Sequence, residues 1–173
     1  MLFKKTLPVM MLSVVLAACG NSNTPSATQE GNTTATHDTL SFESKSGQIT
    51  IPANVSRIAV LDTSALNTIH ALGADDKVVA LPKGTPLPKV LQNYSDGKYL
   101  DVGTVKEPNL EKIAASQPEL ILMSGRMENL VNQIKQIAPT YFVDVDYNDQ
   151  FNSFKQQTLN IAEMVGKKQE AEQ

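Results

Sequence analysis

Short apolar runs alternate with longer amphipathic stretches from residue 39 to the end of the chain. The apolar runs have the length of buried strands and lie at 57–61, 77–81, 100–102, 120–123 and 141–145. Between them, apolar residues recur mostly at helical spacing, so crossover helices are expected to connect the strands. This alternation predicts an α/β fold, a single lobe with a mostly parallel sheet flanked by helices.

Turn and capping residues place the ends of these elements. A hairpin is expected where 40–42 and 48–51 flank the turn at 45–47. The segment Asp62-Thr63-Ser64 is expected to cap the first helix, and Gly73 to end it. The loop at 82–88 contains three prolines, so it is expected to be rigid and unpaired.

Helical spacing also predicts which side chains of each helix face the core. After the Asp62 cap they are Leu66, Ile69 and Leu72; after an Asn109 cap they are Leu110, Ile113 and Ala114; after Arg126 they are Leu130, Ile134 and Ile137; and in the last helix they are Phe154, Ile161 and Val165.

The first nineteen residues, MLFKKTLPVMMLSVVLAAC, have a different character. Two lysines, an apolar stretch and small residues follow one another as in a secretory signal peptide. The ending LAAC resembles the bacterial lipobox, which implies that residues 1–18 are removed and that Cys19 is acylated. Residues 19–38 are polar without periodicity, so a flexible tether is expected. We therefore expect a cell-envelope protein that is lipid-anchored on the extracytoplasmic side, periplasmic or on the outer face.

Composition and motifs narrow the function. The net charge is −3 and the lysines are scattered, so no nucleic-acid partner is expected. No G-x-S-x-G, G-x-x-x-x-G-K-[ST], H-E-x-x-H or G-x-G-x-x-G motif occurs, so the chain is expected not to be an enzyme. The two histidines are His37, in the tether, and His70, read as a packing residue. A metal held by the protein, or any other cofactor, is therefore not expected, and iron would enter only within a bound small molecule.

Three stretches resemble the substrate-binding proteins of ferric-siderophore and vitamin B12 importers, the Fe/B12 periplasmic-binding family. They are ITIPANVSRIAVLDTSALNTIHALG, NLEKIAASQPELILMSGR and SGRMENLVNQIKQIAPTYFVDVD. The last is most similar to lipoproteins that bind ferric catecholate siderophores of the enterochelin type. The resemblance implies two lobes joined by a long helix, with the ligand between them. Residues 39–160 would form the N-terminal lobe, and 161–173 the end of its last helix and the start of a truncated interlobe helix.

The resemblance implies the substrate-binding component of an ABC importer that captures a ferric siderophore, with a catecholate as the expected class. Its partners would be the siderophore, the permease and the membrane, which it would contact through the Cys19 lipid. Two alternatives stay open. The chain could be an inactive half of such a protein, or a lipid-anchored binder of haem, cobalamin or a hydroxamate siderophore.

Ligands of open α/β sheets bind beyond the carboxyl ends of the strands, so the loops there are the candidate site. A ferric tris-catecholate is a trianion, which suits the charged N–H donors of arginine. Arg126 is the leading candidate, and the family's catecholate binders place a chelate-binding arginine at the matching SGR. The other candidate ligand-binding residues are Thr63, Lys83, Thr85, Lys106, Ser124 and Gly125, with Asp62, Ser64, Gly84, Thr104, Val105, Tyr147 and Asn148 in the same loops.

The resemblance also implies a docking residue. Proteins of this family typically meet arginines of the permease through an acidic residue on each lobe. By its position in the helix after SGR, Glu128 matches that acid, and Glu107 and Glu111 lie in the same region of the chain.

Overall fold

The computed structural model describes residues 38–172. The predicted signal peptide, the acylated Cys19 and the tether before residue 38 lie outside the described residues. Among the residues that are described, no helix is both long and apolar enough to cross a membrane.

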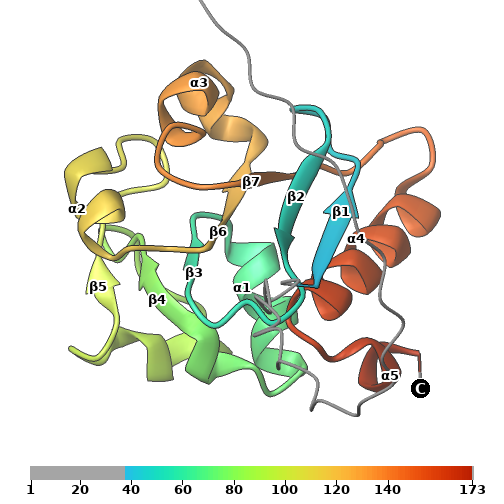
Figure 1. Ribbon diagram of the computed structural model, residues 1–173. Coiled ribbons are helices and arrows are strands. Elements are labelled where there is room, and N and C mark those ends of the chain that lie inside the picture. Colours follow the sequence, from blue (N-terminus) through green and yellow to red (C-terminus); the bar gives the residue numbers. More distant parts are fainter. Residues whose placement is uncertain (1–37, 173) are drawn as a thin grey trace, which may run out of the picture. The chain divides into compact units, whose positions relative to one another are not determined.

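A five-stranded parallel sheet forms the centre of the lobe, with the strand order β5-β4-β3-β6-β7 (Figure 1). The chain adds β4 and β5 on one side of β3 and then returns to add β6 and β7 on the other side. The strand order therefore reverses between β3 and β6, which is where open α/β sheets bind ligands. The strands are β3 (Ile58–Val60), β4 (Val78–Leu81), β5 (Leu100–Asp101), β6 (Leu120–Ser124) and β7 (Thr140–Val143).

Helices cover both faces of this sheet and make three layers. Alternate residues of β3 point to opposite sides: Ile58 and Val60 belong to one core cluster, and Ala59 to the other. The first cluster includes α1 (Thr63–Ala71), α4 (Gln150–Met164) and the 3-10 helix η2 (Lys89–Ser95). The second includes α2 (Leu110–Ala115), the 3-10 helix η3 (Gly125–Leu130) and α3 (Val131–Ile134). A short η1 (Asp75–Lys77) precedes β4, and α5 (Lys168–Ala171) follows α4. The predicted α/β fold is confirmed.

The predicted hairpin is present and forms a separate antiparallel pair, β1 (Thr39–Phe42) and β2 (Ile49–Pro52). Its turn lies along the free edge of β7. The amide of Phe142 donates to the Ser44 hydroxyl over 2.9 Å, and the Ser46 hydroxyl donates to the Thr140 carbonyl over 3.4 Å. Because an exposed strand edge is a template for pairing with other chains, these two side chains protect β7.

The predicted helix ends are confirmed in detail. Asp62 caps α1 by accepting the amides of Ser64 and Ala65, at 2.8 and 2.9 Å. Gly73 follows that helix with a φ of 64°, a conformation that glycine adopts without strain. Asn109 caps α2 by accepting the amide of Lys112. Local side-chain chemistry therefore sets where these two helices begin.

Two predicted core residues are wrong. Ala114 is exposed, because α2 is only six residues long and turns just Ile113 fully into the core. Phe154 is 54% exposed, because α4 contacts the core through its second half, by Ile161, Ala162 and Met164. In both helices the apolar residues have the predicted spacing. That spacing does not show how far the neighbouring elements extend along the helix, and these two side chains lie beyond them.

Candidate ligand-binding pocket

A pocket of about 430 Å³ lies at the carboxyl ends of the central strands. Its walls come from the loops that follow β3, β4, β5 and β6, so it spans the point where the strand order reverses. Thr63 follows β3 and Arg126 follows β6, on the two sides of that point. The lining residues are Thr63, Pro82, Thr85, Pro86, Leu87, Thr104, Val105, Lys106 and Arg126.

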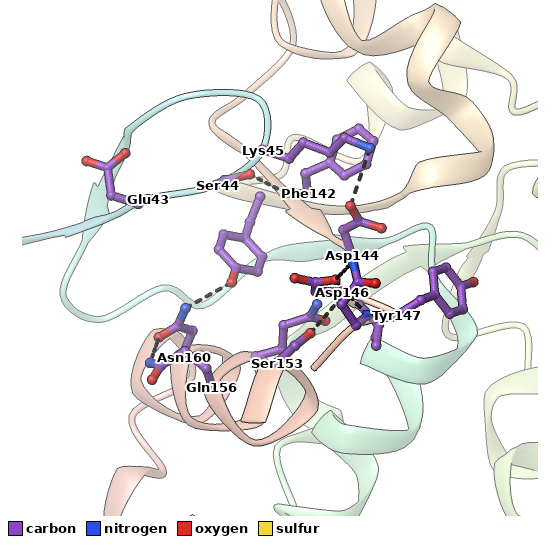
Figure 2. A pocket seen from close by; sticks show the side chains of 14 residues that line it. Glu43, Ser44, Lys45, Phe142, Asp144, Asp146, Tyr147, Ser153, Gln156 and Asn160 are labelled. Carbon is purple, nitrogen blue, oxygen red and sulfur yellow. Dashed lines mark hydrogen bonds and ion pairs between the residues drawn. The ribbon is translucent and has the colours of Figure 1, made fainter. Parts of the chain in front are cut away.

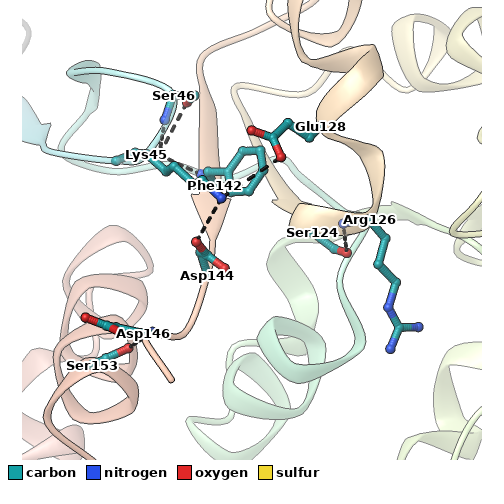
Figure 3. Close-up of polar contacts among 10 residues, drawn as sticks. Lys45, Ser46, Ser124, Arg126, Glu128, Phe142, Asp144, Asp146 and Ser153 are labelled. Carbon is teal, nitrogen blue, oxygen red and sulfur yellow. Dashed lines mark hydrogen bonds and ion pairs between the residues drawn. The ribbon is translucent and has the colours of Figure 1, made fainter. Parts of the chain in front are cut away.

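The chemistry of this pocket suits an anion with apolar flanks. The described residues that line it include two cations, Lys106 and Arg126, and no carboxylate. Among the described residues, no hydrogen bond or ion pair engages the Arg126 guanidinium. Lys45, Glu128 and Asp144 form a charged group nearby, and Figure 3 shows the Arg126 side chain directed away from it. Its N–H donors are therefore available to a ligand.

The remainder of the pocket wall is apolar or hydroxylated. Prolines and aliphatic side chains of the loops after β4 and β5 give it flat apolar surface, and three threonines add hydroxyl groups, although the Thr104 hydroxyl already accepts the amide of Glu107 over 3.0 Å. An anion that carries hydrocarbon or aromatic flanks can contact both surfaces at once.

The loops after β4 and β5 are tied to each other. Asp101 Oδ1 accepts the backbone N–H of Lys83 over 3.0 Å and that of Gly103 over 2.9 Å. These bonds, from Gly103 first and Lys83 second, hold the pKa of the Asp101 carboxyl below its ordinary value. The amide of Gly84 also donates to the Gly103 carbonyl over 2.7 Å. A Cβ on Gly84 would lie 2.9 Å from the Gly103 carbonyl oxygen and 2.6 Å from Thr104 Cγ2, so a larger residue would push the two loops apart.

Four of the predicted ligand-binding residues meet in the pocket, namely Thr63, Thr85, Lys106 and Arg126. Thr104 and Val105, from the same set of loops, lie there as well. Ligands of open α/β sheets bind beyond the carboxyl ends of the strands. This rule correctly predicted that residues up to 63 positions apart in the sequence, from Thr63 to Arg126, lie in one pocket.

The other three predicted residues do not line this pocket. The Lys83 side chain donates to the Asp96 carbonyl and lies over the Tyr99 ring, 6.0 Å from its centroid. Ser124 is buried, and its hydroxyl accepts the amide of Arg126 over 3.1 Å. Gly125 faces the Phe142 ring. Ser124 thus acts on the site indirectly, because it sets the turn that carries Arg126.

A larger pocket of about 770 Å³ lies between the hairpin, the end of β7 and α4 (Figure 2). Three carboxylates, Glu43, Asp144 and Asp146, line it with one cation, Lys45, which gives a net charge of −2. Tyr147 and Asn148, two of the loop candidates, lie here rather than beside Arg126. This charge disfavours an anionic chelate, so the smaller pocket, with a net charge of +2, is the better candidate despite its size.

The region around Glu128 is exposed and charged. Glu128 is 4.0 Å from the Lys45 ammonium, which also pairs with Asp144 at 3.3 Å. Nothing else in the described structure bears on importer docking, which stays a prediction.

His70, the histidine predicted to pack rather than to bind a metal, contacts Asp75 at 2.7 Å and packs edge-on to Tyr94. Within residues 38–172, no group of three or more histidine, cysteine or acidic side chains is arranged to hold a metal ion.

Sequence reasoning missed Asp101 and the apolar wall of the pocket. A signal for Asp101 was present, because Asp-x-Gly favours a bond from the carboxylate to the amide two residues on, as seen here to Gly103. The prolines of the wall were recognised as a rigid loop, but not as surface for a ligand.

Comparison with known proteins places these features in a family. A family profile described as periplasmic binding protein matches residues 58–173. The petrobactin-binding protein YclQ of Bacillus subtilis is 36% identical over 158 residues, which are 91% of this chain and 48% of YclQ. The Fe(3+)-citrate-binding protein YfmC of the same organism is 30% identical, over 95% of this chain and 53% of YfmC. The chain spans about half the length of the curated relatives that it matches.

Solved structures agree with these matches. The crystal structure of YclQ superposes with a TM-score of 0.75 at 33% identity, over 78% of this chain and 48% of YclQ. The periplasmic catecholate-siderophore binding protein VctP of Vibrio cholerae gives a TM-score of 0.72 at 26% identity, over 78% of this chain and 48% of VctP.

Proposed function

We propose that this chain, which belongs to the periplasmic binding protein family, serves an ABC importer by capturing a ferric siderophore outside the cytoplasmic membrane. The observation that carries the proposal is the Arg126 guanidinium, which has no hydrogen-bond or ion-pair partner among residues 38–172 and lines a cationic pocket at the reversal point of the sheet. Relatives named for binding Fe(3+)-citrate and a catecholate siderophore support an iron chelate as the ligand class. Binding, rather than catalysis, is the proposed activity.

The catecholate class is the finer part of the proposal. A catecholate complex carries charged oxygens and flat aromatic rings. Arg126 and Lys106 would contact the oxygens, while Pro86, Leu87 and Val105 would contact the rings. The protein would need no cofactor of its own, because the small molecule supplies all the iron ligands.

The proposed location and partners follow from the sequence. We propose that Cys19 is acylated and holds the protein on the extracytoplasmic side of a membrane, as the LAAC ending implies. Glu128, exposed and beside Lys45, is the proposed contact to an arginine of the permease. Since the chain corresponds to about half of its relatives, a second half of the fold would complete the ligand site.

A titration with a ferric catecholate tests the proposal. The chain from Gly20 onward has four tyrosines and no tryptophan, so quenching of tyrosine fluorescence reports binding. Arg126→Ala should weaken affinity by about 2 kcal/mol or more, roughly 30-fold. Lys83→Ala is the matched control, because this lysine lies in the same loop as Thr85 and Pro86 but its own side chain does not line the pocket.

The outcomes separate three possibilities. Binding that depends on Arg126 and not on Lys83 supports the site. Equal losses with both substitutions would mean non-specific attraction and refute it. If the chain alone does not bind but acquires Arg126-dependent binding when the second half of YclQ is attached, the pocket is correct and one lobe is insufficient.

A further inference from the structure

Two walls of the candidate ligand pocket are carried by elements that also pack against each other away from it. Thr63 is the first residue of α1, and the wall at 85–87 leads directly into η2. α1 and η2 are in contact, and Leu66 of α1 and Leu91 of η2 are buried in the same core cluster. The contact between these two elements therefore bears on the distance between the two walls.

A group of polar side chains joins α1 to η2. His70 lies in the last turn of α1, and its Nδ1 is 2.7 Å from Asp75 Oδ1, in η1. The same carboxylate oxygen accepts the side-chain amide of Asn93, in η2, over 3.0 Å. The neighbouring Tyr94 is fully buried, and its ring packs edge-on to His70 with 6.0 Å between the centroids. We call His70, Asp75 and Asn93 the polar clasp, because one carboxylate holds side chains of both elements.

The η2 segment passes this restraint on to the pocket. The Gln92 side-chain amide donates to the Leu87 carbonyl over 2.6 Å, and the Leu91 amide donates to the Pro88 carbonyl over 2.9 Å. Leu87 both packs against the core and lines the pocket. A 3-10 helix of seven residues has poor internal hydrogen-bond geometry, so its position depends on tertiary contacts such as the clasp.

The loop between β4 and η2 is thereby held at both ends. At its start, the bond from the Lys83 amide to Asp101 ties it to the loop after β5. At its end, the only side-chain hydrogen bond that joins η2 to η1 among the described residues is the one from Asn93 to Asp75. Loss of the clasp would free the end that carries Leu87, while the start would stay in place.

We propose that Asp75 is a positioning residue for the ligand pocket, which fixes the wall at 85–87 relative to Thr63 by holding His70 and Asn93 together. This inference rests on the proposed function, because the wall matters only if the pocket binds a ligand. A wall that is already in place favours binding, since less conformational entropy is then lost when the ligand binds.

Hydrogen exchange and ligand titration of the same variants test this role. Asp75→Ala removes both bonds of the clasp, whereas Asp75→Asn keeps an acceptor oxygen for them. Glu119→Ala is the matched control. The Glu119 carboxylate is also partly exposed and also accepts two bonds, from the amides of Ser56 and Arg57 at 2.7 and 3.3 Å, but none of these residues lines the pocket or belongs to η2.

We expect Asp75→Ala to speed exchange of the Leu91 amide by roughly tenfold or more, because the segment that protects this amide opens locally. The Phe142 amide, which is bonded to Ser44, should exchange at an unchanged rate. Asp75→Asn should restore most of the protection at Leu91, and Glu119→Ala should leave it unaltered.

The affinity for a ferric catecholate is measured in the chain itself or, if that does not bind, in the chain with the second half of YclQ attached. Asp75→Ala should weaken it by about tenfold, which corresponds to a wall that is in place in about one molecule in ten. Asp75→Asn should recover most of the affinity, and Glu119→Ala should retain all of it.

Each other outcome has a definite meaning. Unchanged exchange at Leu91 in Asp75→Ala overturns the proposal, whatever the titration gives. Faster exchange with unchanged affinity, where Arg126→Ala still weakens binding, also overturns it, as does an equal loss of affinity in Glu119→Ala. If neither form of the protein binds the chelate, the proposed function is refuted, and exchange at Leu91 still decides whether Asp75 holds the wall.

Discussion

Replacement of Asp101 tests the loop architecture of the pocket. Its carboxylate joins the loops after β4 and β5 by accepting the amides of Lys83 and Gly103 at 3.0 and 2.9 Å. Asp101→Ala removes both bonds, each worth about 0.5–1.5 kcal/mol net. Because the carboxylate is exposed, we expect a total loss near the lower end, about 1–2 kcal/mol. That corresponds to a melting temperature lower by roughly 3–6 °C.

The same residue predicts a dependence on pH. Backbone N–H donors hold the pKa of Asp101 below its ordinary value in the folded state. A depressed pKa gives stabilisation that is present above the unfolded pKa, about 4, and is lost as the pH falls through the folded pKa. Asp101→Asn keeps an acceptor oxygen but removes the charge. Its deficit in unfolding free energy should therefore be full at pH 7 and shrink below about pH 4.

Urea unfolding followed by circular dichroism measures these differences. The protein and both variants are compared from pH 7 down to the lowest pH at which all three fold. Comparison at each pH cancels the titration of Glu119, whose pKa is also lowered, mainly by a bond from the Ser56 amide. The reasoning fails if Asp101→Ala is as stable as the unaltered chain, or if the deficit of Asp101→Asn is independent of pH.

Three further substitutions, two of them paired with a control substitution, have expected outcomes in urea unfolding. Gly84→Ala should destabilise the lobe by about 1–3 kcal/mol through overlap with the neighbouring loop, whereas Gly97→Ala, whose added Cβ meets nothing within 4 Å, should not. Ile113→Ala should cost about 2–5 kcal/mol because the side chain is fully buried, while Ala114→Ser should change stability by less than about 0.5 kcal/mol. Glu119→Gln should cost about 1 kcal/mol at pH 7, because charge-assisted bonds to Ser56 and Arg57 weaken.

The fold was predictable because its determinants are local. Parallel strands buried on both faces appear as continuous apolar runs, and the caps at Asp62 and Asn109 mark helix starts by side-chain chemistry. The errors at Ala114 and Phe154 have another origin. Whether an apolar helix position is buried depends on how far a neighbouring layer extends, which helical spacing does not record.

The site was predictable as far as topology determines it. The carboxyl ends of parallel strands meet at one edge, so Thr63 and Arg126 could be placed together without coordinates. Lys83 and Lys106 each lie in a loop that follows a strand, so the sequence made both of them candidates. Only the structure shows that Lys106 lines the pocket and Lys83 does not. Lys83 is held by the Asp96 carbonyl and the Tyr99 ring, partners from a segment 13 to 16 residues away that the loop sequence does not specify.

The availability of Arg126 depends on how the neighbouring charges are paired. Glu128 is two residues away and could neutralise the guanidinium, which would leave the pocket without its strongest donor. The Ser124 hydroxyl accepts the Arg126 amide and fixes a turn in which the arginine and Glu128 point apart (Figure 3). Lys45, from the hairpin, lies 4.0 Å from Glu128 and 3.3 Å from Asp144, so these carboxylates face a different cation. The hairpin lysine thus pairs with the carboxylates near Arg126 without lining the pocket, and in the proposed function this pairing would leave the guanidinium to an anionic ligand.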